Sequence, residues 1–261
     1  MPQLMMRKYT VLLLIALFAV LIILVLEKAV RHGPAGAAPV KKTETKKQEF
    51  PERVGEKIIY DVKMGNVRLG KAEFHHLAKV ELNGKTVNQI SFKTELFHFV
   101  DQEMIYGDPD TYLPLKVVRD ILSWPKKEQI IEDYDQQKYH LVITKFVGKN
   151  KPQQTEIQRN GPIQNAILLP YCVRRMAKLE QGWTFKANLP TQSFEIQFTG
   201  MEDVTVPAGT FKSYHFQSSP SRFEIWISAD QRKIPLKIKG SGGIGYVLLM
   251  REYIFDKMPL S

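Results

Sequence analysis

The sequence predicts a mainly β protein, in which an antiparallel sheet curls into a spiral β-roll or barrel-like form against one packed helix. Three observations carry this prediction. Apolar and polar residues alternate with a period of two in many segments, as in strands that bury one face. Turn-forming residues separate these segments at short intervals. Residues 162–182 are the exception, because their apolar residues recur near helical spacing.

The chain starts with a basic tail, residues 1–9, and continues with an uncharged apolar run at residues 10–26. This run has 17 residues, which is at the short end of what spans a bilayer and long for the apolar core of a cleaved signal peptide. The small residues at positions 35–38 lie too far beyond the run for a normal cleavage site. We therefore expect an uncleaved transmembrane helix that acts as a signal-anchor.

Residues 27–53 follow as a flexible, lysine-rich linker without an apolar period. The net charge of the chain is +10, and half of it lies in the first 50 residues. The remainder is only mildly basic and shows no concentrated basic face of the kind that nucleic-acid binding usually needs. The lysine-rich linker fits attraction to an anionic membrane surface better.

Residues 54–261 are expected to form a single β-roll domain. Alternation predicts strands at residues 56–64, 87–97, 138–146, 222–228, 233–240 and 246–255. Turns are predicted at residues 83–84, 107–110, 148–150 and 229–232. Pro170 interrupts the helical segment, so we expect a kinked helix or two short ones packed against the sheet.

The stretch VPAGTF, residues 206–211, predicts a tight corner between two strands. Pro207 fixes φ and lacks a donor, which suits the second position of a turn, and Gly209 can take a positive φ. Phe211 then returns an aromatic side chain to the core. A loop that holds a ligand is the alternative interpretation, and it requires a ligand in contact with the Gly209 backbone.

The domain opens with a Gly-Glu pair before its first strand and a Gly-x-Ala step, and it closes with Pro-Ala-Gly-Thr-Phe followed by Trp-x-Ser-x-Asp-x-Arg-x-x-Pro. Over roughly residues 54–253, these features resemble a family of exported bacterial proteins known as domain of unknown function, family 3108. The resemblance implies a spiral β-roll, similar to that of a capsule-secretion lipoprotein, outside the cytoplasmic membrane. The family has no established activity, so the resemblance implies structural signature positions only: Gly55, Glu56, Gly70, Pro207, Gly209, Trp226, Asp230, Arg232 and Pro235.

Chemical motifs are sparse. The glycine-rich stretch 239–246 lacks the Lys-Ser/Thr of a phosphate-binding loop and precedes a strand, so we interpret it as a hairpin or a sharp bend. Asp108 and Asp110 flank a proline, which favours a turn over an acid–base pair. The single cysteine, Cys172, excludes an intramolecular disulfide and a zinc site built from cysteines. We predict no catalytic, cofactor-binding or metal-binding residues, and no cofactor.

We expect a non-enzymatic binding or assembly module of the cell envelope, whose ligand or partner is a lipid, a polysaccharide or an envelope protein. The expected location is the cytoplasmic (inner) membrane, with a single span and the C-terminal domain in the periplasm. Lys and Arg near the apolar run are more numerous after it than before it, which opposes this orientation, so the orientation rests on the resemblance. An envelope glycan hydrolase or transferase and a structural scaffold of an envelope complex are the alternatives.

Overall fold

The structure, a computed structural model, describes residues 53–175, 179–180, 182–240 and 245–255. The chain divides after residue 51, and residues 52–261 form the second of its two units. The predicted tail, the signal-anchor at residues 10–26 and nearly all of the linker lie outside the described residues. Within the described ranges, no helix is long and apolar enough to cross a membrane. The described fold is therefore that of the second unit.

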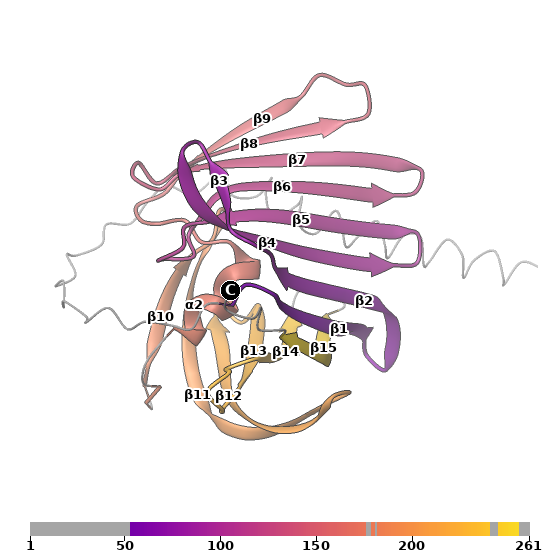
Figure 1. Ribbon diagram of the computed structural model, residues 1–261, viewed down its shortest axis with the longest axis vertical. Coiled ribbons are helices and arrows are strands. Elements are labelled where there is room, and N and C mark those ends of the chain that lie inside the picture. The colour runs from indigo at the N-terminus through magenta and orange to yellow at the C-terminus, as the bar shows by residue number, and fades with distance from the viewer. Residues whose placement is uncertain (1–52, 176–178, 181, 241–244, 256–261) are drawn as a thin grey trace, which may run out of the picture. The chain divides into compact units, whose positions relative to one another are not determined.

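The second unit is built on one antiparallel sheet of 15 strands (Figure 1). The strands are β1 (Glu56–Met64), β2 (Val67–His76), β3 (Val80–Leu82), β4 (Lys85–Leu96), β5 (Phe99–Gly107), β6 (Pro114–Ser123), β7 (Lys126–Asp135), β8 (His140–Val147), β9 (Gln153–Gln158), β10 (Thr184–Asn188), β11 (Ser193–Val206), β12 (Gly209–Ser219), β13 (Phe223–Ser228), β14 (Pro235–Gly240) and β15 (Tyr246–Phe255). The mainly β, curled antiparallel fold that the sequence predicts is confirmed.

The strands follow the order β10-β11-β12-β13-β14-β15-β1-β2-β4-β5-β6-β7-β8-β9, and β3 pairs with β4 beside this path. Most neighbours in the sheet are thus neighbours in the chain. The main departure is that the last strand, β15, pairs with the first, β1. This pairing joins the two halves of the domain, and it leaves β9 and β10 as the ends of the path.

Strand β1 shows how the sequence produces the sheet. Ile58, Tyr60 and Val62 alternate along it, and all three are buried. Partners on both sides, β2 and β15, satisfy its backbone groups. A strand placed between two others with one apolar face turned inward cannot slip by one residue, because the slip would carry those three side chains to the opposite face.

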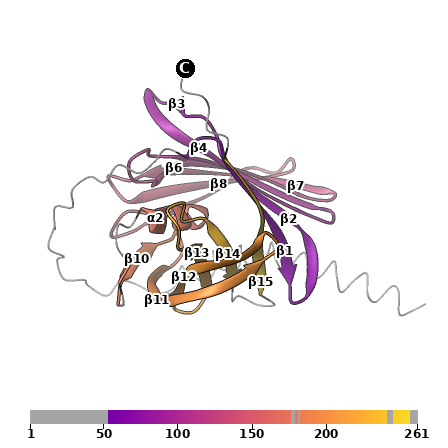
Figure 2. The ribbon, with the colours of Figure 1, turned by 60° about the horizontal axis from the view of Figure 1, so that its bottom comes forward.

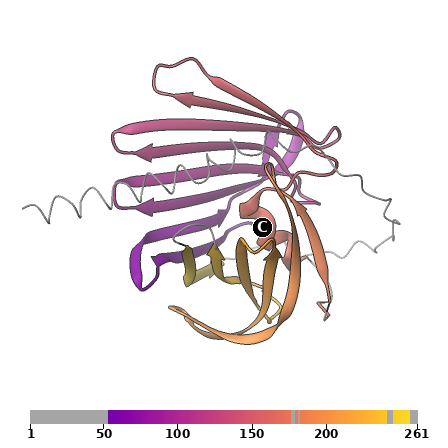
Figure 3. The same cartoon turned by 180° about the vertical axis from the view of Figure 1, so that it is seen from behind.

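The inward face of the sheet packs on a 3-10 turn, η2 (Ala166–Leu168), and a short helix, α2 (Leu169–Arg174). Figures 1 and 2 show α2 between strands β1–β9 and strands β10–β15, and Figure 3 shows the same placement from behind. Leu169 and Val173 share one buried cluster with Ala187, Ile196, Phe198, Phe216, Ile225 and Ile227. Burying one aliphatic side chain of this kind contributes about 1.5–3 kcal/mol, so α2 is an integral part of the core.

The helical segment is shorter than residues 162–182 suggest, and it consists of two short pieces, as the proline indicates. Asn165 accepts a hydrogen bond from the N–H of Ile167 at 2.8 Å and so caps η2. Pro170 lies in the first turn of α2, where a missing N–H costs nothing. The backbone N–H of Gln164 instead donates to the carbonyl of Asn188, the last residue of β10, at 2.8 Å, which holds the start of the segment out of the helix.

The stretch VPAGTF is the turn of the β11–β12 hairpin, as expected. Val206 pairs with Gly209, so Pro207 and Ala208 form the two-residue turn between them. Gly209 has φ +134°, a conformation that residues with a side chain rarely adopt. The N–H of Ala208 donates to the carbonyl of Met250 at 3.2 Å, which fastens the corner to β15.

Candidate functional site

Glu56, a position of the signature, is fully buried and accepts hydrogen bonds from two other elements. Its carboxylate takes two from the guanidinium of Arg174, at 2.7 and 2.6 Å, and one each from the hydroxyls of Tyr171 and Tyr253, at 3.0 Å. Burial alone would raise the pKa of Glu56, but the hydrogen bonds and charge of Arg174, with the charge of Arg53, hold that pKa below its usual value. Glu56 thereby fastens β1 to α2 and β15.

The closing part of the signature, Asp230, Arg232 and Pro235, lies at the same junction of β1 and α2. Asp230 accepts a hydrogen bond from the backbone N–H of Arg232 at 3.0 Å and another from its guanidinium at 2.6 Å. The carbonyl of Arg232 then accepts from Arg174 at 2.9 Å, and the carbonyl of Pro235 accepts from the hydroxyl of Tyr60 at 3.0 Å. The two ends of the signature therefore meet around a buried arginine that the sequence analysis did not single out.

Of the remaining signature positions, Gly55 directly precedes Glu56, and the others support separate parts of the sheet. A Cβ on Gly70 would stand 2.0 Å from the carbonyl oxygen of Glu95, so β2 approaches β4 too closely for any side chain. Gly55 has φ +88° at the entry to β1. Trp226 is buried beneath His215, whose ring stacks on it at 4.2 Å. Each of these positions supports the sheet.

The acidic turn at residues 107–110 holds the backbone together. Asp108 accepts hydrogen bonds from the N–H groups of Asp110 and Thr111, at 3.1 and 2.8 Å. These bonds form the turn that the sequence favours.

Burial raises the pKa of the Cys172 thiol to about 11. In the described part of the chain, no group of three His, Cys, Asp or Glu side chains could hold a metal ion.

A charged cluster on neighbouring strands β5, β6 and β7 was not anticipated from the sequence. Arg119 donates to both carboxylate oxygens of Asp101, with Nε 2.8 Å from Oδ1, and lies 3.6 Å from Glu103. Burial raises the pKa of Glu103 to about 7 against the opposing charge of Arg119, and the carboxylates of Asp101 and Glu132 add to the rise. The members of the cluster are brought together by the strand register, which places Glu103 opposite Arg119. The sequence alone does not give this register.

Four hairpin turns line up at one end of strands β1–β9 (Figure 1). We call their exposed side chains the tip surface; the turns are residues 64–68, 96–99, 123–127 and 147–152. Three large apolar side chains are exposed there: Val67 at 60%, Phe97 at 74% and Trp124 at 71%. The ring of His98 lies 4.0 Å from that of Phe97 and 6.4 Å from that of Trp124, so two of these turns form one aromatic patch.

The charges on the tip surface have one sign. Its four turns hold five basic residues and no Asp or Glu: Arg68, Lys126, Lys127, Lys149 and Lys151. The turns at the opposite end of the same strands, residues 76–85, 107–114 and 135–140, hold four acidic and three Lys residues. Positive charge and exposed aromatic area therefore coincide at a single end of the sheet.

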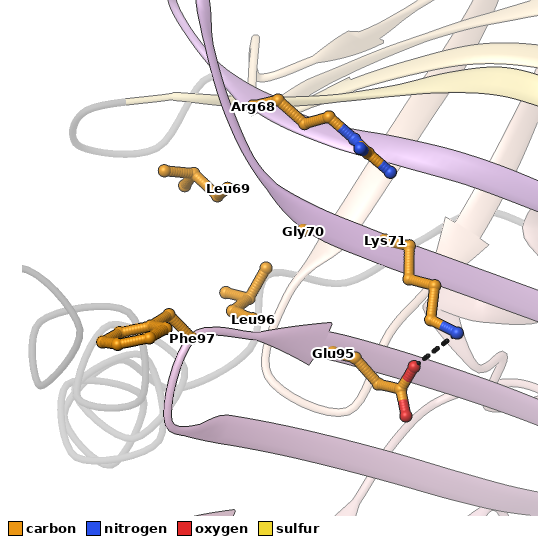
Figure 4. A pocket seen from close by; sticks show the side chains of 7 residues that line it. All are labelled: Arg68, Leu69, Gly70, Lys71, Glu95, Leu96 and Phe97. Atoms are coloured by element: carbon orange, nitrogen blue, oxygen red, sulfur yellow. Dashed lines mark ion pairs between the residues drawn. The ribbon is translucent and has the colours of Figure 1, made fainter.

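Two hollows open at this end. The first, of about 360 Å³, is lined by residues 68–71 and 95–97. Figure 4 shows Leu69, Leu96 and Phe97 gathered on one side of it and the ion pair of Lys71 with Glu95 on the other. This pair measures 2.8 Å, and Arg68 pairs with Asp61 at 2.9 Å, so carboxylates already neutralise the cations of the first hollow.

The second hollow, of about 590 Å³, lies between the β6–β7 turn and the β8–β9 turn and is lined by residues 125–128 and 147–150. It contains Lys126, Lys127 and Lys149, and none of the three pairs with a carboxylate within the described ranges. The acidic residue in its lining, Glu128, pairs with Lys145 at 2.8 Å. The second hollow therefore keeps an unneutralised positive charge.

Sequence reasoning missed the tip surface because it placed Phe97 at the end of the predicted strand 87–97 and gave Trp124 no role. The available signal was local: both lie in turns, where polar residues are the rule, and lysines follow Trp124. What the sequence did not reveal was that these turns share one end of the sheet, which depends on strand pairing.

Comparison with known proteins adds a family and two distant structures. The model of a family described as "Protein of unknown function (DUF3108)" matches residues 59–251. No curated protein matches the chain in sequence. A β-barrel-like protein of domain of unknown function DUF1849 from Brucella abortus is 8% identical, with 80% of this chain and 100% of that one covered and a TM-score of 0.48. A protein with a YmcC-like fold from Bacteroides fragilis is 9% identical, with 78% and 98% covered and a TM-score of 0.28.

Proposed function

Because the chain belongs to the family of proteins of unknown function DUF3108, whose description assigns no activity, we propose a function from its own surface: a non-enzymatic binding module that works on a membrane. In this proposal the domain lies outside the cytoplasmic membrane and rests its tip surface on anionic lipid.

The observation that carries the proposal is the coincidence of exposed aromatic and basic side chains on the tip surface. Trp124 and Phe97 are more than two-thirds exposed. The four turns hold five cations and no acidic residue, and of these cations Arg68 pairs with Asp61 of β1. Tryptophan favours the boundary between lipid and water, where its ring is buried and its N–H stays hydrated. Each Lys or Arg near an anionic membrane surface contributes about 1 kcal/mol of attraction.

The predicted N-terminal segments support the same arrangement. An anchor at residues 10–26 would hold the domain to the bilayer through the linker at residues 27–53. A flexible chain of that length has an end-to-end distance of about 30 Å, so the domain would stay within reach of the lipid surface. Such a tether raises the effective concentration of the tip surface at the membrane and lets individually weak contacts suffice.

The edge strand β9 favours a second role, assembly with a protein partner. It ends the path of the sheet, and five of its six residues are exposed. Proline and lysine, which commonly protect such edges, do not occur between Gln153 and Gln158. A partner could add a strand there. The acidic turn at residues 107–110 gives the alternative of a glycan hydrolase no support, because the Asp108 carboxylate accepts hydrogen bonds that hold the turn.

Hydrogen–deuterium exchange of the full chain in nanodiscs tests the membrane role. Anionic nanodiscs should slow exchange of the amides at residues 96–99 and 123–127 relative to zwitterionic ones, because docking shields these turns from water. The turns at residues 107–114 and 135–140 lie at the opposite end of the strands and serve as the internal control. Equal exchange of the tip turns in both lipids would remove the basis of the proposal.

A further inference from the structure

We propose that the second hollow of the tip surface is a binding site for the phosphate group of an anionic lipid headgroup. This inference rests on the proposed function, since it gives the docked membrane a specific point of contact. Docking by charge and aromatic contact alone would need no such site, so the two ideas can fail separately.

The charge of the hollow points to an anionic ligand. Three lysines line it: Lys126 and Lys127 at the start of β7, and Lys149 in the β8–β9 turn. In the described part of the chain, these lysines have no carboxylate partner, while Glu128 is held by Lys145 at 2.8 Å. Three like charges gathered without a counter-ion repel one another, and a bound anion removes that repulsion. Phosphate oxygens accept hydrogen bonds from several ammonium groups at once.

The other lining groups fit a phosphate that carries a glycerol group. Pro125 and Val147 supply apolar walls, against which the carbon atoms of the headgroup can pack. Asn150 supplies an amide donor, and its backbone N–H closes the turn onto the carbonyl of Val147 at 3.1 Å. Gly148, with φ +55°, lets the chain fold back there. The hollow thus joins donors and apolar surface next to Trp124, the residue that would enter the lipid boundary.

The first hollow provides a contrast within the same surface. Its cations, Arg68 and Lys71, are already paired with Asp61 and Glu95. A phosphate there would meet the negative charges of these carboxylates beside the cations, and this repulsion weakens its attraction to the hollow. The structure therefore assigns the headgroup to the second hollow.

Two lysines of one turn provide the test, because only Lys149 lines the hollow while Lys151 lies two residues farther along. The full chain is placed in nanodiscs with an increasing fraction of phosphatidylglycerol, and the fraction at which Trp124 fluorescence reaches half of its shift is measured. Lys149→Gln should raise this fraction about tenfold or more, since it removes a charged hydrogen bond. Lys151→Gln should raise it by no more than about fivefold, the effect of one surface charge.

Lys149→Arg keeps the charge and the donors, and it should retain most of the wild-type response. Equal effects of Lys149→Gln and Lys151→Gln would overturn the headgroup site and leave membrane docking intact. No fluorescence shift in the wild-type chain would overturn docking itself. Free glycerol 3-phosphate at millimolar concentration should not displace the lipid; displacement would show that the hollow takes a soluble phosphate ester and would contradict the assignment to lipid.

Discussion

Arg174 of helix α2 donates two hydrogen bonds to Glu56 of strand β1 inside the domain, from Nη1 to Oε2 at 2.7 Å and from Nη2 to Oε1 at 2.6 Å. The two side chains are 5% and 0% exposed. They stand 118 residues apart in the chain, so their contact joins the first strand to the helix that packs against the sheet. Arg174 also holds the carbonyl of Arg232, which extends the junction to the turn before β14.

Removing one partner of this pair should destabilise the domain strongly. Glu56→Gln leaves the buried guanidinium of Arg174 without its counter-charge, and we expect a loss of about 3–5 kcal/mol in the free energy of unfolding. Urea denaturation of the full chain, followed by tryptophan fluorescence, measures this loss. The double variant Glu56→Leu with Arg174→Met leaves neither charge buried alone and should recover part of the stability. A single variant as stable as the wild type would contradict the role of the pair.

Glu103 should make stability fall as the pH rises from about 4.5 to about 7. Its folded pKa, about 7, lies above its usual value of 4.5, so in this range the folded state binds more protons than the unfolded state. The slope of stability against pH is then negative for this group. Urea midpoints at several pH values measure the slope. Glu103→Gln should flatten it between these two pH values, and an unchanged slope in the variant would refute the assignment.

Gly70 should tolerate no side chain. The Cβ of Gly70→Ala would lie 2.0 Å from the carbonyl oxygen of Glu95, so β2 and β4 would have to separate, and we expect a cost of more than about 2 kcal/mol. Gly65→Ala is the matched control. Nothing lies within 4 Å of its added Cβ, but Gly65 has φ +57°, so the control should lose only about 1 kcal/mol from backbone strain. Thermal unfolding that ranks the two variants in the reverse order would contradict the close strand approach.

Local patterns predicted local structure well. Alternation placed strand β1 at residues 56–64, which the structure reproduces. The conformational limits of Pro207 and Gly209 placed the β11–β12 corner, and Pro170 indicated that the helical segment would break into short pieces. These features depend on residues that are close together in the chain, and their backbone preferences follow directly from the residue types.

Long-range relationships could not be read in the same way. Alternation shows which residues share a face, but it does not show that β15 pairs with β1 or that Arg174 reaches Glu56. The tip surface depends on such pairing too, since the turns that hold Phe97 and Trp124 become neighbours, with His98 between the two rings, only when β5 pairs with β6. The signal-anchor at residues 10–26 lies outside the described residues and stays a prediction.

Trp124 provides the measurement that tests membrane docking most directly. The chain has three tryptophans, Trp124, Trp183 and Trp226, and none lies in the predicted anchor or linker. Insertion of the anchor therefore cannot bring a tryptophan into the bilayer. With the full chain in anionic nanodiscs, brominated lipid chains should quench part of the fluorescence, because Trp124 enters the lipid boundary.

Trp124→Ser should abolish this quenching, while Trp183→Phe should leave it unchanged. If brominated lipid quenches the wild-type chain no more than it quenches the Trp124→Ser variant, the tip surface does not touch the membrane, and the proposed function is wrong.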